Sequence, residues 1–428
     1  MQIIENPPKS GWTQLLARPQ QETGALEAAV RSIMQEVKRG GDQAVDKYSL
    51  SFDGVSLKER LVSEAEIAEA ESLVSDKLKT AIRQAARNIE AFHRRQLVQE
   101  EAVETMPGIR CWRKAMPIEK VGLYIPGGTA PLFSTVLMLA IPASIAGCPE
   151  ILLCSPPDKT GKLHPAILFA ASLTGVKKIY KAGGVQAIAA MAYGTESMPR
   201  VDKIFGPGNQ YVTCAKQLLQ QEGIAIDMPA GPSELAVYAD ESANPAFVAA
   251  DLLSQCEHGA DSQVILICLQ KSIALNVAKE IEKQTELLPR RDIIRKSLQH
   301  SKAIVVNDAE TAMDLINAYA PEHLILSCSN ATALAEHVQQ AGSVFIGHYA
   351  PETAGDYASG TNHTLPTNGY ARAYSGVSVD SFIRKISFQQ LSEKGLQGIS
   401  DTLIEMAHAE GLQAHAAAVE IRIKSLNA

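Results

Sequence analysis

The sequence VGLYIPGG at residues 121–128 has the pattern that decides the fold. Its apolar run of five residues is followed by a proline–glycine turn, after which a helical pattern continues to Ala146. Similar apolar runs at 151–154, 178–180 and 201–205 are each followed by a helical pattern, the last two after glycine-containing turns. Strands that alternate with helices in this way are typical of a parallel sheet with crossover helices.

A second series of strand patterns follows in the next hundred residues. The chain of 428 residues is too long for one hydrophobic core, because single cores stop growing near ~250–300 residues. We therefore expect an α/β protein with two domains, each with a parallel sheet, and a crossing between them near 233–235. The expected strands of the second series are 235–239, 264–268, 303–306, 323–326 and 343–346.

The remaining segments are expected to surround these two sheets. Residues 22–95 have helical periodicity, and Ser63 with Glu66 predicts a capping box. Residues 347–376 are rich in small residues with little periodicity, which indicates a functional loop. The chain after Val379 has a mostly helical pattern. The expected domains are an N-terminal extension (1–21), a first α/β domain (22–118 with 237–378), a second α/β domain (119–236) and a helical tail (379–428).

Composition excludes several classes of protein. The chain is 46% hydrophobic and 20% charged, and its net charge of −7 gives no electrostatic reason to bind nucleic acid. No basic region followed by an apolar core opens the chain, and the most apolar stretch, 131–148, is interrupted by Pro142, so we expect neither a secretory signal nor a membrane span. The seven cysteines include no Cys-x-x-Cys pair. Reduced thiols in the cytoplasm are therefore expected.

Two short motifs place polar groups where chemistry is possible. Gln255 and His258 are three residues apart on a helical pattern, so they share a face and can hold a metal ion, although an exposed helix end is the alternative. Glu322 and His323 are adjacent at the start of a strand, where neighbouring side chains point to opposite faces. They can share a site only if the turn at Pro321 twists the backbone. The alternative is a strand-entry histidine bonded to the backbone.

The loop and the tail add further candidates. Asp356 and His363 lie in the 347–376 loop among small residues, which suits a loop folded closely over a ligand, although a surface loop has the same composition. In the tail, alanines flank His415, which could therefore pack against another surface, or be exposed. Glycine-rich turns after the first strands suit phosphate groups at helix N-termini. No Gly-x-Gly-x-x-Gly follows any strand, however, so the standard dinucleotide fingerprint is absent.

Taken together, these segments resemble the histidinol dehydrogenase family over nearly the whole chain. The resemblance implies a fold of two incomplete Rossmann-like domains with parallel sheets and small helical N- and C-terminal extensions, which agrees with the layout above. Several motifs in the family's order are more specific than any one motif alone. The resemblance is least distinctive in the tail, because there it depends on Glu410, His415 and the spacing between them. The matching segments are 122–128, 182–186, 205–209, 230–234, 254–259, 320–323 and 355–363.

The resemblance implies a zinc ion and a shared active site. In the family the zinc ligands are a glutamine, two histidines and an aspartate, and one histidine comes from the partner subunit of a homodimer. That last role falls on His415. These side chains offer the nitrogen and oxygen donors that zinc accepts. The implied zinc ligands in this sequence are Gln255, His258, Asp356 and His415.

The resemblance also implies the reaction. L-Histidinol would be oxidised to L-histidine through an enzyme-held aldehyde, and two NAD molecules would be consumed in succession. His323 would be the general base and Glu322 the group that activates water for the second oxidation. Tyr124, Gln186 and Asn209 match residues that contact NAD. The implied substrate contacts are Ser233, Gln255, His258, His323, Asp356, His363, Glu410 and His415.

Three other functions are compatible with two α/β domains. A cysteine-dependent aldehyde dehydrogenase would need a reactive thiol, and Cys148 and Cys154 near the first sheet are the candidates. Both lie in apolar surroundings without a nearby base, where thiols are usually inert. A non-enzymatic binding protein with a cleft between its domains is the second alternative. The third is a zinc hydrolase without NAD, and an assay for NADH formation separates it from a dehydrogenase.

Overall fold

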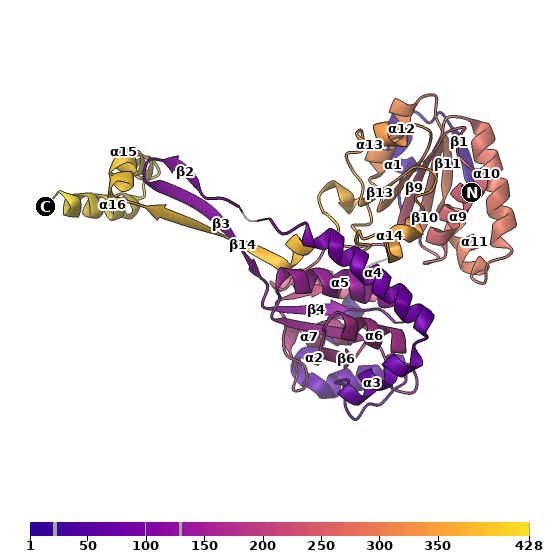
Figure 1. Ribbon diagram of the computed structural model, residues 1–428, viewed down its shortest axis with the longest axis horizontal. Helices are drawn as coiled ribbons and strands as arrows, with labels where there is room; N and C mark the ends of the chain where they lie inside the picture. The colour runs from indigo at the N-terminus through magenta and orange to yellow at the C-terminus, as the bar shows by residue number, and fades with distance from the viewer. Residues whose placement is uncertain (20–23, 99, 128–130, 428) are drawn as a thin grey trace. The chain divides into compact units, whose positions relative to one another are not determined.

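The computed structural model describes residues 1–19, 24–98, 100–127 and 131–427. Within them the chain forms two compact units, which we describe separately. The first comprises residues 1–96 and 118–382, and the second comprises 97–117 and 383–428. The first unit contains two parallel sheets covered by helices (Figure 1). The α/β fold with parallel sheets predicted from the sequence is therefore confirmed.

The first expected series of strands forms a five-stranded parallel sheet with the order β6-β5-β4-β7-β8. Alternate residues of its central strand face opposite sides, since Leu123 belongs to one hydrophobic cluster and Tyr124 to the other. The sequence did not predict β8. The strands are β4 (Lys120–Tyr124), β5 (Glu150–Ser155), β6 (Lys178–Lys181), β7 (Lys203–Phe205) and β8 (Ala225–Ile226).

Helices cover both faces of this sheet. The crossover helices α5 (Phe133–Ala146) and α6 (Pro165–Leu173) share one cluster of buried side chains, whereas α7 (Gly184–Tyr193) and α8 (Gln210–Gln221) share the other. The strand order reverses between β4 and β7, so the carboxyl ends of these two strands form the switch point where open α/β sheets bind ligands.

The N-terminal helices pack on the five-stranded sheet, which differs from the expected domain division. Helix α2 (Gly24–Tyr48) packs against α7 and α8, α3 (Glu64–Leu73) against α6, and α4 (Asp76–Arg94) against α5. The expected grouping of 22–118 with 237–378 is therefore wrong for these helices. An apolar stripe predicts that a helix is buried but does not identify the sheet that buries it. The predicted capping box of Ser63 and Glu66 is confirmed at the start of α3.

The second sheet has six parallel strands in the order β1-β11-β10-β9-β12-β13. Its edge strand β1 lies within residues 1–21, which we had expected to be an extension. β1 pairs with β11, a partner about three hundred residues away that four residues of local sequence cannot reveal. The strands are β1 (Gln2–Glu5), β9 (Glu234–Ala239), β10 (Gln263–Cys268), β11 (Lys302–Val305), β12 (His323–Ser327) and β13 (Ser343–Ile346).

The connections of the six-stranded sheet are helical. The short helix α1 (Trp12–Leu15) follows β1 along the chain, and Trp12 is buried in the core. The crossover helices are α9 (Pro245–Cys256), α10 (Lys271–Thr285), α11 (Arg291–His300), α12 (Ala309–Tyr319) and α13 (Ala331–Ala335).

The loop at 347–376 is more ordered than its composition indicated. It contains the helix α14 (Glu352–Tyr357) and a short 3-10 turn at Tyr370–Arg372. Long-range hydrogen bonds also fix it to helices. Asn362 Nδ2 donates to the Met138 carbonyl at 2.6 Å, and Asn88 Nδ2 donates to the Ala358 carbonyl at 2.8 Å.

The second unit contains a three-stranded antiparallel sheet and two helices. Strand β3 (Ile109–Pro117) lies between β2 (Val103–Met106) and β14 (Ile383–Leu391). The expectation of a tail that is helical from 379 is wrong at β14, and 97–117 pairs with this strand rather than joining an α/β domain. The expected helices are present as α15 (Glu393–Ala409) and α16 (Gln413–Leu426). No helix among the described residues is long and apolar enough to cross a bilayer.

Candidate active site

The end of helix α9 carries the first two candidate metal ligands. Gln255 lies in its last turn, is only 1% exposed, and has a side-chain oxygen without a hydrogen-bond partner among the described residues. The helix ends at Cys256, and His258 follows on the exposed side. A buried amide oxygen without a partner is costly unless something absent from the polypeptide satisfies it.

Helix α14 brings two carboxylates to the same place. Glu352 and Asp356 are four residues apart and share a face of this helix. Ligand atoms of His258, Glu352 and Asp356 all lie within 4.8 Å of one another. Sequence reasoning missed Glu352. Its spacing from Asp356 was the available signal, but a segment interpreted as an irregular loop gave no reason to apply helical spacing.

The electrostatics of this cluster favour a cation. Burial, with the neighbouring Asp356 charge, raises the pKa of Glu352 to about 8, and burial raises the pKa of Asp356 to about 6. Burial and the Glu352 charge together raise the pKa of Asp251 to about 7. Ser254 Oγ donates to one Glu352 oxygen at 2.8 Å, and the other oxygen has no partner among the described residues. A divalent ion would relieve this crowding of negative charge.

The turn before β12 lets Glu322 and His323 share one site, as the sequence required. Ala320 adopts a left-handed backbone conformation with φ 51°, which reorients the chain at the end of α12. His323 Nδ1 then lies 3.7 Å from Glu322 Oε2, and His323 Nε2 lies 3.7 Å from Asp356 Oδ1. The structure therefore brings the expected acid–base pair to the carboxylate cluster.

Burial disfavours the charged form of both members of this pair. It lowers the pKa of His323 to about 3 and raises the pKa of Glu322 well above its usual value. The Glu234 backbone N–H donates to Glu322 Oε2 at 2.9 Å, which opposes the rise. A neutral imidazole is the form that accepts a proton.

His363 connects this cluster to the first sheet's helices. Its Nδ1 lies 2.8 Å from the Asp356 carbonyl oxygen, and its Nε2 lies 3.1 Å from Thr135 Oγ1 in the first turn of α5. Because Nδ1 must donate to a carbonyl, Nε2 is left to accept from the threonine hydroxyl. Burial lowers the pKa of His363 to about 4.

A buried ion pair between Arg18 and Glu234 lies next to Glu322. Arg18 donates to both carboxylate oxygens of Glu234, through Nε and, at 2.8 Å, through Nη2. The Arg18 guanidinium also lies 4.3 Å from the centre of the Tyr319 ring. Glu234 Oε1 accepts from the Asn368 backbone N–H at 2.7 Å. This network ties the N-terminal segment and the long loop to the strand that positions Glu322.

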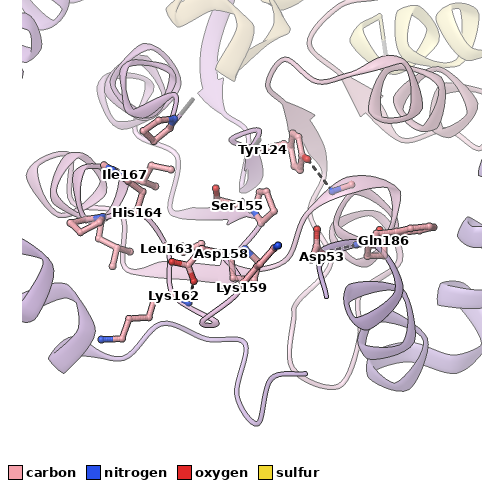
Figure 2. A pocket seen from close by; sticks show the side chains of 18 of the residues that line it. Asp53, Tyr124, Ser155, Asp158, Lys159, Lys162, Leu163, His164, Ile167 and Gln186 are labelled. Atoms are coloured by element: carbon pink, nitrogen blue, oxygen red, sulfur yellow. Dashed lines mark hydrogen bonds between the residues drawn. The ribbon is translucent and has the colours of Figure 1, made fainter. Parts of the chain in front are cut away.

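The three residues expected to contact NAD line one cavity of about 1120 Å³ at the carboxyl ends of the five-stranded sheet (Figure 2). Tyr124 OH accepts from the Gly184 N–H at 3.0 Å, and Asn209 Oδ1 caps helix α8. Gln186 is 1% exposed, and its side-chain oxygen has no partner among the described residues. Gly128 of the first glycine motif lies outside the described residues.

Three further residues expected to contact the substrate or the zinc ion lie outside the carboxylate cluster and the NAD cavity as the structure describes them. Ser233 directly precedes β9 and is half-buried, and its carbonyl accepts from the Gln263 N–H at 3.1 Å. Glu410 and His415 belong to the second compact unit, where Glu410 ends α15 and His415 lies in the first turn of α16. Both are exposed.

The two cysteines considered as nucleophiles are buried and unreactive in character. Burial raises the pKa of Cys148 to about 11 and raises that of Cys154 further. Cys148 Sγ contacts the Phe382 carbonyl, and Cys154 Sγ contacts the Met198 sulfur. Among the described residues, no basic side chain lowers the pKa of either thiol.

Comparison with known proteins identifies the family. A family model described as histidinol dehydrogenase matches residues 16–423. The chain belongs to the histidinol dehydrogenase family. Histidinol dehydrogenase from Bacteroides thetaiotaomicron is 60% identical over 426 residues, and the match covers 100% of this chain and 100% of that protein. The Haemophilus influenzae enzyme is 51% identical over 414 residues, 96% of each chain. The crystal structure of histidinol dehydrogenase from Elizabethkingia anophelis is similar with a TM-score of 0.98 and 54% identity, over 100% of this chain and 99% of that one.

Membership of the histidinol dehydrogenase family gives the chain its chemistry. It is an NAD-dependent oxidoreductase of histidine biosynthesis that catalyses the final step of the pathway, with zinc and NAD as its cofactors. The cysteine-dependent aldehyde dehydrogenase, the non-enzymatic binding protein and the zinc hydrolase are thereby excluded as its function.

Proposed function

We propose that this enzyme oxidises L-histidinol to L-histidine in two successive hydride transfers, through L-histidinaldehyde, and uses two NAD molecules. The observation that carries the proposal is the position of His323, whose two ring nitrogens lie 3.7 Å from Glu322 and from Asp356. One imidazole thus adjoins both a second acid–base group and the carboxylate cluster that suits a metal ion.

We propose Gln255, His258, Asp356 and His415 as the zinc ligands. The partnerless Gln255 oxygen and the proximity of the His258 and Asp356 donor atoms support the first three. Ligand atoms of Glu352 and Asp356 lie within 4.8 Å of one another and Glu352 accepts a hydrogen bond from Ser254, and we propose that Glu352 orients Asp356. Zinc bound there would supply a positive charge that orients the substrate's amine and imidazole nitrogens.

The acid–base steps are assigned to the buried pair. His323 would take the alcohol proton, and bound NAD would supply the acceptor for the hydride of the carbinol carbon. After the aldehyde forms, the Glu322 carboxylate takes a proton from the water that adds to the carbonyl carbon, and His323 returns its proton to the carbonyl oxygen, which gives the hydrate and a neutral imidazole. His323 then removes the hydroxyl proton of the hydrate as the second hydride leaves.

The cavity supports the NAD contacts that we propose, and the carboxylate cluster supports some of the proposed substrate contacts. We propose that Tyr124, Gln186 and Asn209 contact NAD, since all three line the cavity at the switch point of the sheet. The proposed substrate contacts are Ser233, Gln255, His258, His323, Asp356, His363, Glu410 and His415.

We propose a cytoplasmic homodimer in which a second copy of the chain supplies Glu410 and His415. The exposure of both residues and the small alanines that flank His415 support a packed contact here. Mixing two inactive variants, His323→Asn and His415→Ala, tests this. Heterodimers would contain one intact site, so activity should return toward about a quarter of the wild-type value. Independent sites within each chain would give no recovery.

The decisive experiment follows NADH with L-histidinol as the substrate. Two NADH per histidinol and L-histidine as the product are expected. Chelation should abolish turnover, and metal analysis should show about one zinc per chain before chelation and none after it. One NADH per histidinol with released aldehyde, or full activity of zinc-free protein, would contradict the proposal.

A further inference from the structure

A short π-helical segment, Ser49–Asp53, forms part of the wall of the NAD cavity. It continues α2 and ends at Gly54, which has a left-handed φ of 71°. Phe52 and Asp53 both line the cavity. Single π-helical turns are often found at functional sites, because they reposition side chains that a regular helix would turn elsewhere. Neither residue has a part in the NAD contacts assigned above.

Asp53 places a carboxylate beside a buried amide. Gln186 Nε2 donates to Asp53 Oδ2 at 3.4 Å, as Figure 2 shows. Asp53 makes no ion pair within the described residues, although Lys159 lines the same cavity. Burial raises the pKa of Asp53. The Gln186 oxygen is free to accept a further hydrogen bond. Two acceptors side by side match the two neighbouring hydroxyls of a ribose.

Phe52 offers a flat apolar surface next to this carboxylate. Its side chain is 60% exposed although it lines a cavity, and its ring stacks on Tyr48 with centroids 5.6 Å apart. An exposed aromatic ring that is held by a second ring is suited to stack on a planar base.

The position of the reaction site decides which half of NAD lies here. The nicotinamide must approach the cluster that Thr135 of α5 contacts through His363. α5 and α6 pack together on one face of the sheet, whereas α2 and α7, which carry the Asp53 and Gln186 wall, pack on the other. Figure 2 shows Asp53 and Gln186 on the opposite side of the cavity from His164 and Ile167 of the α6 wall. The adenosine half therefore belongs on the Asp53 side.

We propose that Asp53 binds the adenosine ribose and selects NAD over NADP, with Phe52 stacked on the adenine. This inference rests on the NAD site proposed above. A carboxylate accepts hydrogen bonds from both ribose hydroxyls, whereas the 2′-phosphate of NADP would bring a like charge to Asp53 and would lack the hydroxyl proton that the carboxylate accepts.

The test measures the dissociation constants of NADH and NADPH by fluorescence titration of the full-length protein without substrate. Asp53→Asn should weaken NADH binding roughly tenfold to 100-fold, because hydrogen bonds to a charged group are lost, and it should leave NADPH binding unchanged or improved. Asp46→Asn is the matched control. Asp46 lies on α2, is not among the cavity-lining residues, and pairs with Arg60, which keeps Asp42 as a partner. Both constants should stay near their wild-type values in this control.

A second variant tests the adenine contact with AMP as the probe, displacing bound NADH. Phe52→Ala should weaken AMP roughly fivefold to 100-fold, the usual value of one stacked base, and Phe52→Tyr should restore most of the affinity.

Three results would overturn the inference. Equal weakening of NADH and NADPH by Asp53→Asn would place the carboxylate at the other ribose. Unchanged binding of both cofactors would remove Asp53 from the site while histidinol-dependent NADH formation still supported the proposed reaction. If Gln186→Ala also left NADH binding unchanged, the cavity itself would not be the NAD site, and the inference would fail together with that assignment.

Discussion

Replacement of Arg18 by methionine should strongly destabilise the six-stranded sheet. The variant keeps the apolar part of the side chain but leaves Glu234 without the donors that reach both of its oxygens. The Glu234 side chain is 2% exposed and that of Arg18 is 14% exposed, so water cannot replace the guanidinium. The Tyr319 carbonyl, which accepts from Arg18 Nη2 at 2.7 Å, also loses a donor.

The size of the effect follows from the burial of the pair. Removal of one partner from a buried ion pair costs about 3–5 kcal/mol, because an uncompensated charge remains in the interior. A domain of 150–250 residues loses about 2–4 °C of melting temperature per kcal/mol, so we expect a drop of roughly 6–20 °C. The Asn368 N–H still donates to Glu234, which favours the lower part of this range.

Scanning calorimetry at pH 7 measures this drop, with two further variants for comparison. Lys9→Met removes an ion pair with Asp314 whose side chains are 76% and 52% exposed, so it should cost less than about 1 kcal/mol. Arg18→Met combined with Glu234→Gln removes the buried charge as well and should recover part of the lost stability. The reasoning is refuted if Arg18→Met costs no more than Lys9→Met, or if the double variant is no more stable than Arg18→Met.

Three further predictions concern the acid–base pair and the capping box. His323→Asn should lower kcat for histidinol about 10²–10⁴-fold, as expected for a general base, and full activity in steady-state assays would refute this role. Glu322→Gln should slow the oxidation of added histidinaldehyde more than that of histidinol, since only the second oxidation needs an activated water; equal slowing would argue against it. Burial raises the pKa of Glu66, but the hydrogen bonds with Lys181 and Ser63 outweigh burial and lower this pKa below its ordinary value of 4.5. The stability that the Glu66 carboxylate gives to the folded protein is therefore present above pH 4.5 and is lost as the pH falls through the lowered folded-state pKa. Glu66→Gln should therefore cost about 0.5–2 kcal/mol in urea unfolding at pH 7 and little near pH 3, and a cost that does not change with pH would contradict this assignment.

The sequence predicted the strands of the two parallel sheets well because their signals are local. An apolar run such as 121–125 needs only its own residues and the following turn to be recognised. Strand β1 and the β2–β3–β14 sheet lacked such signals. β1 is four residues long, and β14 is almost entirely exposed, so neither shows the apolar pattern of a buried strand.

The candidate site was predicted residue by residue but not as an arrangement. The resemblance named His258 and Asp356 without showing that their ligand atoms lie within 4.8 Å of one another. Glu352 entered the cluster only because 352–357 forms a helix, which small residues and glycine did not indicate.

The sequence alone determined the alternation of strands and helices, the family, and the polar residues available for chemistry. These depend on side-chain type and short-range order along the chain. The tertiary structure alone decided that the N-terminal helices cover the five-stranded sheet, that Arg18 supports Glu234, and that His323 lies between two carboxyl groups. Such contacts join residues tens to hundreds of positions apart, and their geometry is set by how whole helices and sheets pack, which no local pattern encodes.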